Sequence, residues 1–70
     1  MNYVVVIEQA ADGSFSAFVP DLPGCVSCGD SVDEVTRSIR EAIELHIDSL
    51  RQHGEPVPQP AAKATFVDVA

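Results

Sequence analysis

Two cysteines, Cys25 and Cys28, stand in the C-x-x-C spacing found in redox and metal sites. A redox pair needs its first cysteine at a helix N-terminus, but here the helix signals begin only after both. In an extended segment this odd spacing puts the two residues on opposite faces, about 10 Å apart and beyond disulfide reach. Two thiolates are also only half of a structural zinc site. We therefore favour small packed residues over redox or metal roles, and expect no metal and no cofactor.

A histidine and three carboxylates on the predicted helix are the other chemically capable groups. His46 lies in an apolar stripe, where a packed or interface histidine is favoured over a catalytic one. Glu41, Glu44 and Asp48 share the opposite face, which could bind a divalent ion. Two arginines stand four residues before the two glutamates, within reach of an ion pair. A solvated face is thus favoured, with an acidic docking surface as the alternative.

The charge balance is strongly acidic, with eleven Asp and Glu against four Lys and Arg and a formal charge of −7. Such a chain repels phosphate backbones and anionic membranes, and its natural complement is a basic protein. The longest apolar run, at residues 3–7, is far too short to cross a bilayer, and no targeting leader precedes it. We therefore expect no membrane partner and a cytoplasmic location.

Seventy residues form at most one small domain, which we place over residues 1–70. A chain of this length buries only roughly 60% of its unfolded surface, so a second copy commonly completes the burial. The apolar arc of the predicted helix is also wider than one sheet face requires. Leu45 and Ile47 flank that arc on either side. We predict a homodimer or higher homo-oligomer, with these two residues as its candidate interface.

Alternating and β-branched patterns predict four strands, at about residues 3–9, 14–19, 25–29 and 64–69. Asp12 and Gly13 form the turn signal of a hairpin between the first two. The proline-rich residues 55–60 are expected to run as an extended connector. The right-handed crossover rule would place the last strand parallel to its neighbour, most plausibly the first strand.

Turn and cap signals separate these strands from one long helix, predicted over about residues 32–53. Pro20, Pro23 and Gly24 stop the second strand and turn the chain. Two residues open the helix, because Ser31 can cap it and Glu34 can return a hydrogen bond to the cap. Gly54 supplies the left-handed position that ends it. The order is βββαβ, an α+β fold with one mostly antiparallel sheet packed by one long helix.

Taken together, residues 3–60 resemble the HicB family, the antitoxins of bacterial HicA/HicB toxin–antitoxin pairs. The distinctive parts are Asp12-Gly13 with Phe15 and Phe18, the "VPDLPGC" turn, "GDS" with Glu34, "REAIELHI" and "GEPVPQP". The resemblance implies a partial, truncated ribonuclease H-like fold with the same βββαβ order but without that enzyme's catalytic carboxylates. Because the first strand carries only Glu8, we expect no enzyme.

The resemblance further implies tight binding to a small basic toxin that cleaves mRNA. The candidate contacts are Asp21, Leu22, Glu41, Glu44 and Asp48. Family members that bind their promoter carry a further C-terminal segment, which we do not expect here, so no direct DNA binding is predicted. The alternative function is an orphan homo-oligomeric module without a toxin, binding another peptide or ligand near the "PDLPG" turn.

Overall fold

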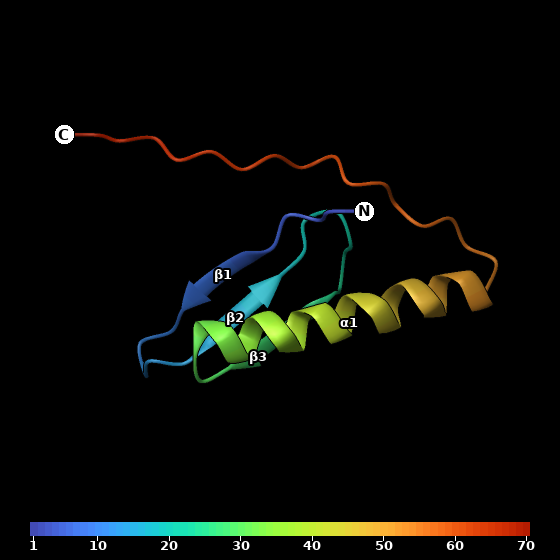
Figure 1. Ribbon diagram of the computed structural model, residues 1–70, viewed down its shortest axis with the longest axis horizontal. Coiled ribbons are helices and arrows are strands. Elements are labelled where there is room, and N and C mark those ends of the chain that lie inside the picture. Colours follow the sequence, from blue (N-terminus) through green and yellow to red (C-terminus); the bar gives the residue numbers. More distant parts are fainter.

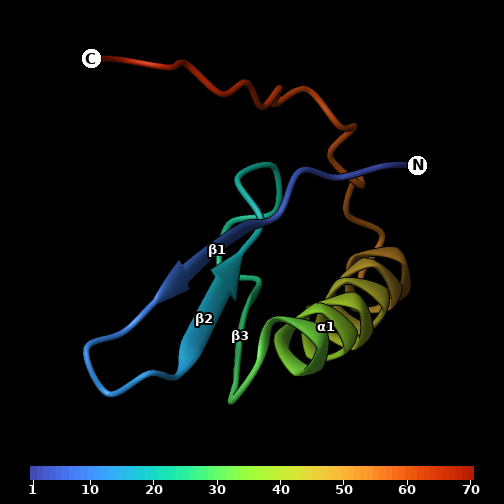
Figure 2. The same ribbon diagram turned by 60° about the vertical axis from the view of Figure 1, so that its left-hand side comes forward.

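A computed structural model describes the chain from residue 1 to residue 70. Three short strands, β1 (Val6–Gln9), β2 (Phe15–Phe18) and β3 (Val26–Gly29), form one antiparallel sheet in the order β1-β2-β3. One helix, α1 (Val32–Gln52), packs against one face of this sheet and lies nearest to β3 and β2 (Figures 1 and 2). The predicted α+β class, with one antiparallel sheet and one long helix, is confirmed.

The strand register decides which side chains face the helix. Ile7, Ala17 and Ser27 are directly opposite one another across the three strands, on the face that α1 covers. Their neighbours Phe18 and Val26 point to the other face and are 39% and 65% exposed. Because side chains alternate along a strand, one face of the sheet is packed and the other stays open.

The core is small and comes from the middle strand, the β2–β3 turn and the first half of the helix. Partly buried side chains extend it along β1 and the next turn of α1, including Tyr3, Val5 and Ile43. Few side chains are fully enclosed, as expected for a chain of this length. The buried residues are Ala17, Val19, Leu22, Cys25, Val35 and Ile39.

The helix is longer than the sheet that it covers. Its 21 residues span about 31 Å, whereas a four-residue strand spans about 13 Å. The C-terminal half of α1 therefore extends beyond the strands (Figure 1). There the half-buried His46, Ile47 and Leu50 continue the apolar stripe without a strand beneath them.

The predicted caps fix both ends of α1. The Ser31 hydroxyl accepts a hydrogen bond from the Glu34 N–H at 3.0 Å. The return bond differs from the prediction by one residue, because the Glu34 carboxylate accepts from the Asp30 N–H instead of the Ser31 N–H. At the other end, Gly54 adopts φ +68° and donates to the Arg51 carbonyl, in the Schellman arrangement.

Gly29 allows the end of β3 to approach the start of the helix. A Cβ at this position would lie 2.9 Å from the backbone nitrogen of Val35. That separation is shorter than van der Waals contact, so only a residue without a side chain fits. The sheet and the helix are thus joined at their tightest point by a glycine.

The strand predicted at about residues 64–69 does not form within the chain, and this part of the prediction is wrong. The connector is anchored beside Asp21, whose carboxylate accepts from the N–H groups of Ala61 and Ala62 at 3.0 and 3.1 Å. Beyond that anchor the chain leaves the body, and Phe66 is fully exposed. Figures 1 and 2 show the C-terminal segment running clear of the sheet.

The first strand is also shorter than predicted, because β1 begins at Val6 instead of at about residue 3. Continued antiparallel pairing would bring Val5 opposite Val19. The Val19 N–H points to the other neighbour and donates to the Cys25 carbonyl at 3.2 Å. The next residue that could donate to the first strand is Pro20, which has no N–H, so the pairing ends at Val6.

Candidate protein-binding surfaces

An open groove lies between the N-terminal segment and the helix. One side is formed by Met1–Val5 and the other by α1, with a volume of about 540 Å³. Its apolar residues are Met1, Tyr3, Val5, Ile39, Ile43 and Ile47. The groove exists because α1 lies nearer to β3 than to β1, so the helix-facing side of β1 is only partly covered.

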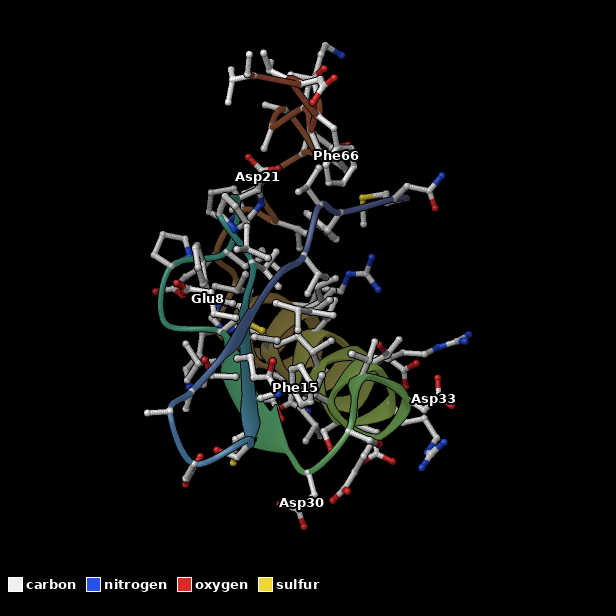
Figure 3. All side chains as sticks on the ribbon, turned by 90° about the vertical axis from the view of Figure 1, so that its left-hand side faces the viewer. Glu8, Phe15, Asp21, Asp30, Asp33 and Phe66 are labelled. Atoms are coloured by element: carbon white, nitrogen blue, oxygen red, sulfur yellow. The ribbon has the colours of Figure 1, made fainter.

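A group of carboxylates gathers at the end of the molecule where the hairpin turn and the β3–α1 turn meet. The register brings the turns together, because Phe15 pairs with both Gln9 and Gly29. Asp12 and Asp30 come from these turns and Asp33 and Glu34 from the first turn of α1, and Figure 3 places Asp30 and Asp33 away from Asp21. No lysine or arginine lies in either turn or in the first turn of α1, and the first cation of the helix is Arg37. We call these four residues the acidic end.

Asp12 is held in its turn by its own neighbour. Its carboxylate accepts from the Ser14 hydroxyl at 2.6 Å and from the Ser14 N–H at 2.9 Å. These hydrogen bonds lower the pKa of Asp12 below its ordinary value, because they stabilise the ionised form. Asp12 therefore keeps its negative charge to a lower pH than a free carboxyl group.

The three carboxylates predicted on the helix are exposed as expected, but their charge is partly offset. Glu44 lies 3.4 Å from the Arg40 Nε in an exposed ion pair at the rim of the groove. Glu41 and Asp48 are exposed and have no ion-pair partner. The helix face, for which the sequence favours a solvated surface with an acidic docking surface as the alternative, thus holds two uncompensated carboxylates, against four at the acidic end.

The two cysteines are separated by the sheet, as the strand geometry predicts. Cys25 is buried in the core, and this burial raises the pKa of its thiol by desolvating the thiolate. Cys28 is exposed on the open face of β3, so the expectation that both would be packed is wrong for this residue. Neither forms a disulfide, and no group of three His, Cys, Asp or Glu residues could hold a metal ion.

Two candidate partner contacts in the "PDLPG" turn have structural roles. Leu22 is completely buried, so its side chain cannot touch a partner and its assignment to the binding surface is wrong. The turn buries it because the Leu22 N–H donates to Val19 and its carbonyl accepts from Cys25. Asp21 is half-buried and uses one carboxylate oxygen to anchor the connector.

The two candidate interface residues do not share a surface. Ile47 lines the groove and is half-buried, whereas Leu45 is 70% exposed and lies outside the groove. Two positions apart on a helix are separated by about 200°, which places them on opposite flanks. Leu45 and Ile47 stay a predicted interface, and of the two only Ile47 lies in the groove.

The acidic end was missed by sequence reasoning although each of its carboxylates was visible there. Asp12 stands some twenty residues from Asp33, and only strand pairing brings their two turns to one end. The hairpin signal and the odd number of antiparallel strands could have revealed this arrangement. In an antiparallel meander successive turns lie at alternate ends of the sheet. The first hairpin turn and the turn after β3 therefore lie at the same end.

The fold and these surfaces define a small acidic α+β domain with an open groove and an open sheet face. Comparison with known proteins is consistent with a protein-binding role. The family model for the HicB-like antitoxin of bacterial toxin–antitoxin systems matches residues 3–69, and the chain belongs to this family. The single helix of this chain, α1, does not combine the length and the apolar character needed to cross a membrane.

Two of the similar relatives carry the family designation UPF0150. A UPF0150 protein of Synechocystis sp. is 48% identical over 58 residues, covering 83% of this chain and 73% of the relative. A UPF0150 protein of Thermoplasma acidophilum is 40% identical over 67 residues, covering 96% of this chain and 97% of the relative. An uncharacterized protein of Haemophilus phage HP1 is 39% identical over 59 residues, which cover 84% of this chain but 44% of the relative.

Proposed function

We propose that this protein is an antitoxin that binds and neutralises a small basic toxin of the HicA type, an enzyme that cleaves mRNA. The proposal rests on the match of the HicB-like antitoxin family model to residues 3–69. The formal charge of −7 supports it, because a basic toxin is drawn to an acidic surface. The antitoxin would act by covering the toxin's catalytic surface, with no chemistry of its own.

The acidic end is the best-supported place for the first encounter. Its carboxylates are exposed, come from two loops and the first turn of α1, and take part in no ion pair. Complementary charge mainly raises the association rate, and the effect weakens with salt. The exposed Glu41 and Asp48 on the outer face of α1 offer a second acidic surface, since Glu44 is already paired with Arg40.

The functional test is co-expression with a small basic protein encoded beside this chain. Growth arrest by the neighbour should be relieved by this chain, and the two should co-purify. If arrest persists while both proteins are soluble and present, neutralisation is refuted. The alternative function, an orphan binding module without a toxin, would then be preferred.

The location of the encounter surface is tested by two matched double variants. Asp30→Asn with Asp33→Asn removes two charges from the acidic end, and neither side chain makes a hydrogen bond that folding depends on. Glu41→Gln with Asp48→Asn removes the same charge from the helix face. We expect the first pair to slow toxin association several-fold at low salt and the second to slow it less. If the second pair slowed association more than the first, the encounter surface would lie on the helix face instead.

A further inference from the structure

The last residues of the chain have the composition of a strand but no partner in their own body. Residues 64–69 read "ATFVDV", rich in the aromatic and β-branched side chains that favour sheets. In the structure Phe66 is 100% exposed, Val67 76% and Val69 81%. We call these six residues the C-terminal segment. Figure 2 shows it extended and separate from both the sheet and the helix.

The chain as a whole exposes more surface than a folded monomer of its mass. It presents 5306 Å² to solvent, whereas a compact 7.5 kDa protein presents about 4,200 Å². Its radius of gyration is 13.5 Å, against about 11 Å for a compact chain of this length. The surplus of about 1,000 Å² is close to the roughly 800 Å² that each partner buries in a standard interface.

The edge of β1 can accept a strand. The sheet order is β1-β2-β3, so β1 is paired on one side only and presents free backbone groups on the other. The apolar groove lies beside the extended residues that lead into β1, between Tyr3 and Val5 on one side and Ile39 and Ile43 on the other. A strand added there would pair its backbone with β1 and place alternate side chains over the groove.

The anchoring of the connector directs the C-terminal segment away from this edge in its own chain. Pro58 accepts a hydrogen bond from the Tyr3 hydroxyl at 2.6 Å, and Asp21 accepts from the N–H groups of Ala61 and Ala62. The connector is thereby fixed across the end of the sheet. The segment that follows continues outward instead of turning back along β1 (Figure 1).

From these observations we infer that the C-terminal segment of one copy pairs with the β1 edge of a second copy and covers its groove. The exchange is reciprocal, because a two-fold axis presents each segment to the other copy's edge. It buries apolar side chains that a single chain leaves in water and fills the groove beside Ile43. This inference does not depend on toxin binding, and it assigns self-association to a segment outside the helix.

The first test is the mass in solution at micromolar concentration. The full chain should sediment at twice its 7.5 kDa mass. Val67→Pro should sediment as a monomer, because proline removes an N–H and is excluded from a paired strand. Ala70→Pro is the matched control, since it adds the same residue beyond the segment, and should stay dimeric. A monomeric full chain, or a dimeric Val67→Pro variant, would overturn the inference.

The second test identifies which chain supplies the strand. In a mixture of ¹³C-labelled and unlabelled copies, isotope-filtered spectra should show Phe66 ring protons close to Val5 or Ile43 methyl groups between different chains. Contacts found only within one chain would mean that the segment folds back onto its own sheet, which refutes exchange. Far-ultraviolet circular dichroism should show the same helix in Val67→Pro as in the full chain, since Val67 is 76% exposed and lies outside the core.

Discussion

Truncation of Leu22 is the sharpest test of how much the "PDLPG" turn contributes to the stability of the fold. Leu22 is fully enclosed between the sheet and α1, whereas its position between two prolines makes it look like an exposed turn residue. Leu22→Ala removes a buried side chain and leaves a cavity, which costs roughly 2–5 kcal/mol of unfolding free energy. A domain of this length has only about 4–10 kcal/mol in total. The variant should therefore lose about a fifth of its stability or more.

The chain supplies its own matched control in Leu45, which is also a leucine but is 70% exposed on α1. Leu45→Ala should change the unfolding free energy by no more than about 0.5 kcal/mol. Both variants are compared by urea unfolding at equal chain concentration, because self-association would make the midpoint concentration-dependent. Equal losses for the two variants, or a loss below about 1 kcal/mol for Leu22→Ala, would refute the placement of Leu22 in the core.

Three further perturbations test individual features. Gly29→Ala should destabilise the fold by about 1–3 kcal/mol in urea unfolding, because its Cβ would press on the Val35 backbone; a neutral change would contradict that contact. Because the pKa of Asp12 is lowered on folding, its ionised carboxylate should stabilise the fold at pH values above its ordinary pKa of 3.8. This stabilisation should be lost as the pH falls through the folded-state pKa. Unfolding midpoints of wild type and Asp12→Ala should thus converge in acid, and a constant difference would be inconsistent with this cause. A thiol reagent should modify Cys28 quickly and Cys25 only on unfolding. The Cys28→Ser variant should therefore lack the fast phase of the modification reaction, and a fast phase that persists would contradict the burial of Cys25.

The helix and its ends could be predicted from sequence because their signals are local. Ser31, Glu34 and Gly54 each act within one turn of their own position, and all three lie at the ends of α1 as expected. The hairpin at Asp12 is local in the same sense. Each of these features depends on residues close in the sequence, so a single chain suffices to reveal it.

Features set by distant residues were harder to predict. The composition of residues 64–69 indicates a strand but not which edge it pairs with, and its own chain carries it away through the anchor at Asp21. Leu22 is buried by hydrogen bonds that fold the turn inward, which composition does not reveal. The acidic end depends on strand pairing between turns that are separate in the sequence. The partial ribonuclease H-like architecture stays a prediction.

Charge patterns require the same care, because the carboxylates of an acidic helix face can be partly offset by neighbouring cations. Glu44 is offset by Arg40 one turn earlier, as such a spacing allows. An exposed ion pair of this kind contributes little to stability, but it lowers the field that a basic partner meets. Arg37 stands four residues after Asp33, but no carboxylate of the acidic end takes part in an ion pair, which makes these residues the stronger candidates for steering.

Inhibition of the neighbouring basic protein's mRNA cleavage by this purified chain is the most direct test of the proposed function. Cleavage should disappear when the chain is added at one copy per toxin. The Asp30→Asn, Asp33→Asn double variant should reach the same end point more slowly at low salt. Unchanged cleavage in the presence of excess folded chain would contradict the antitoxin function.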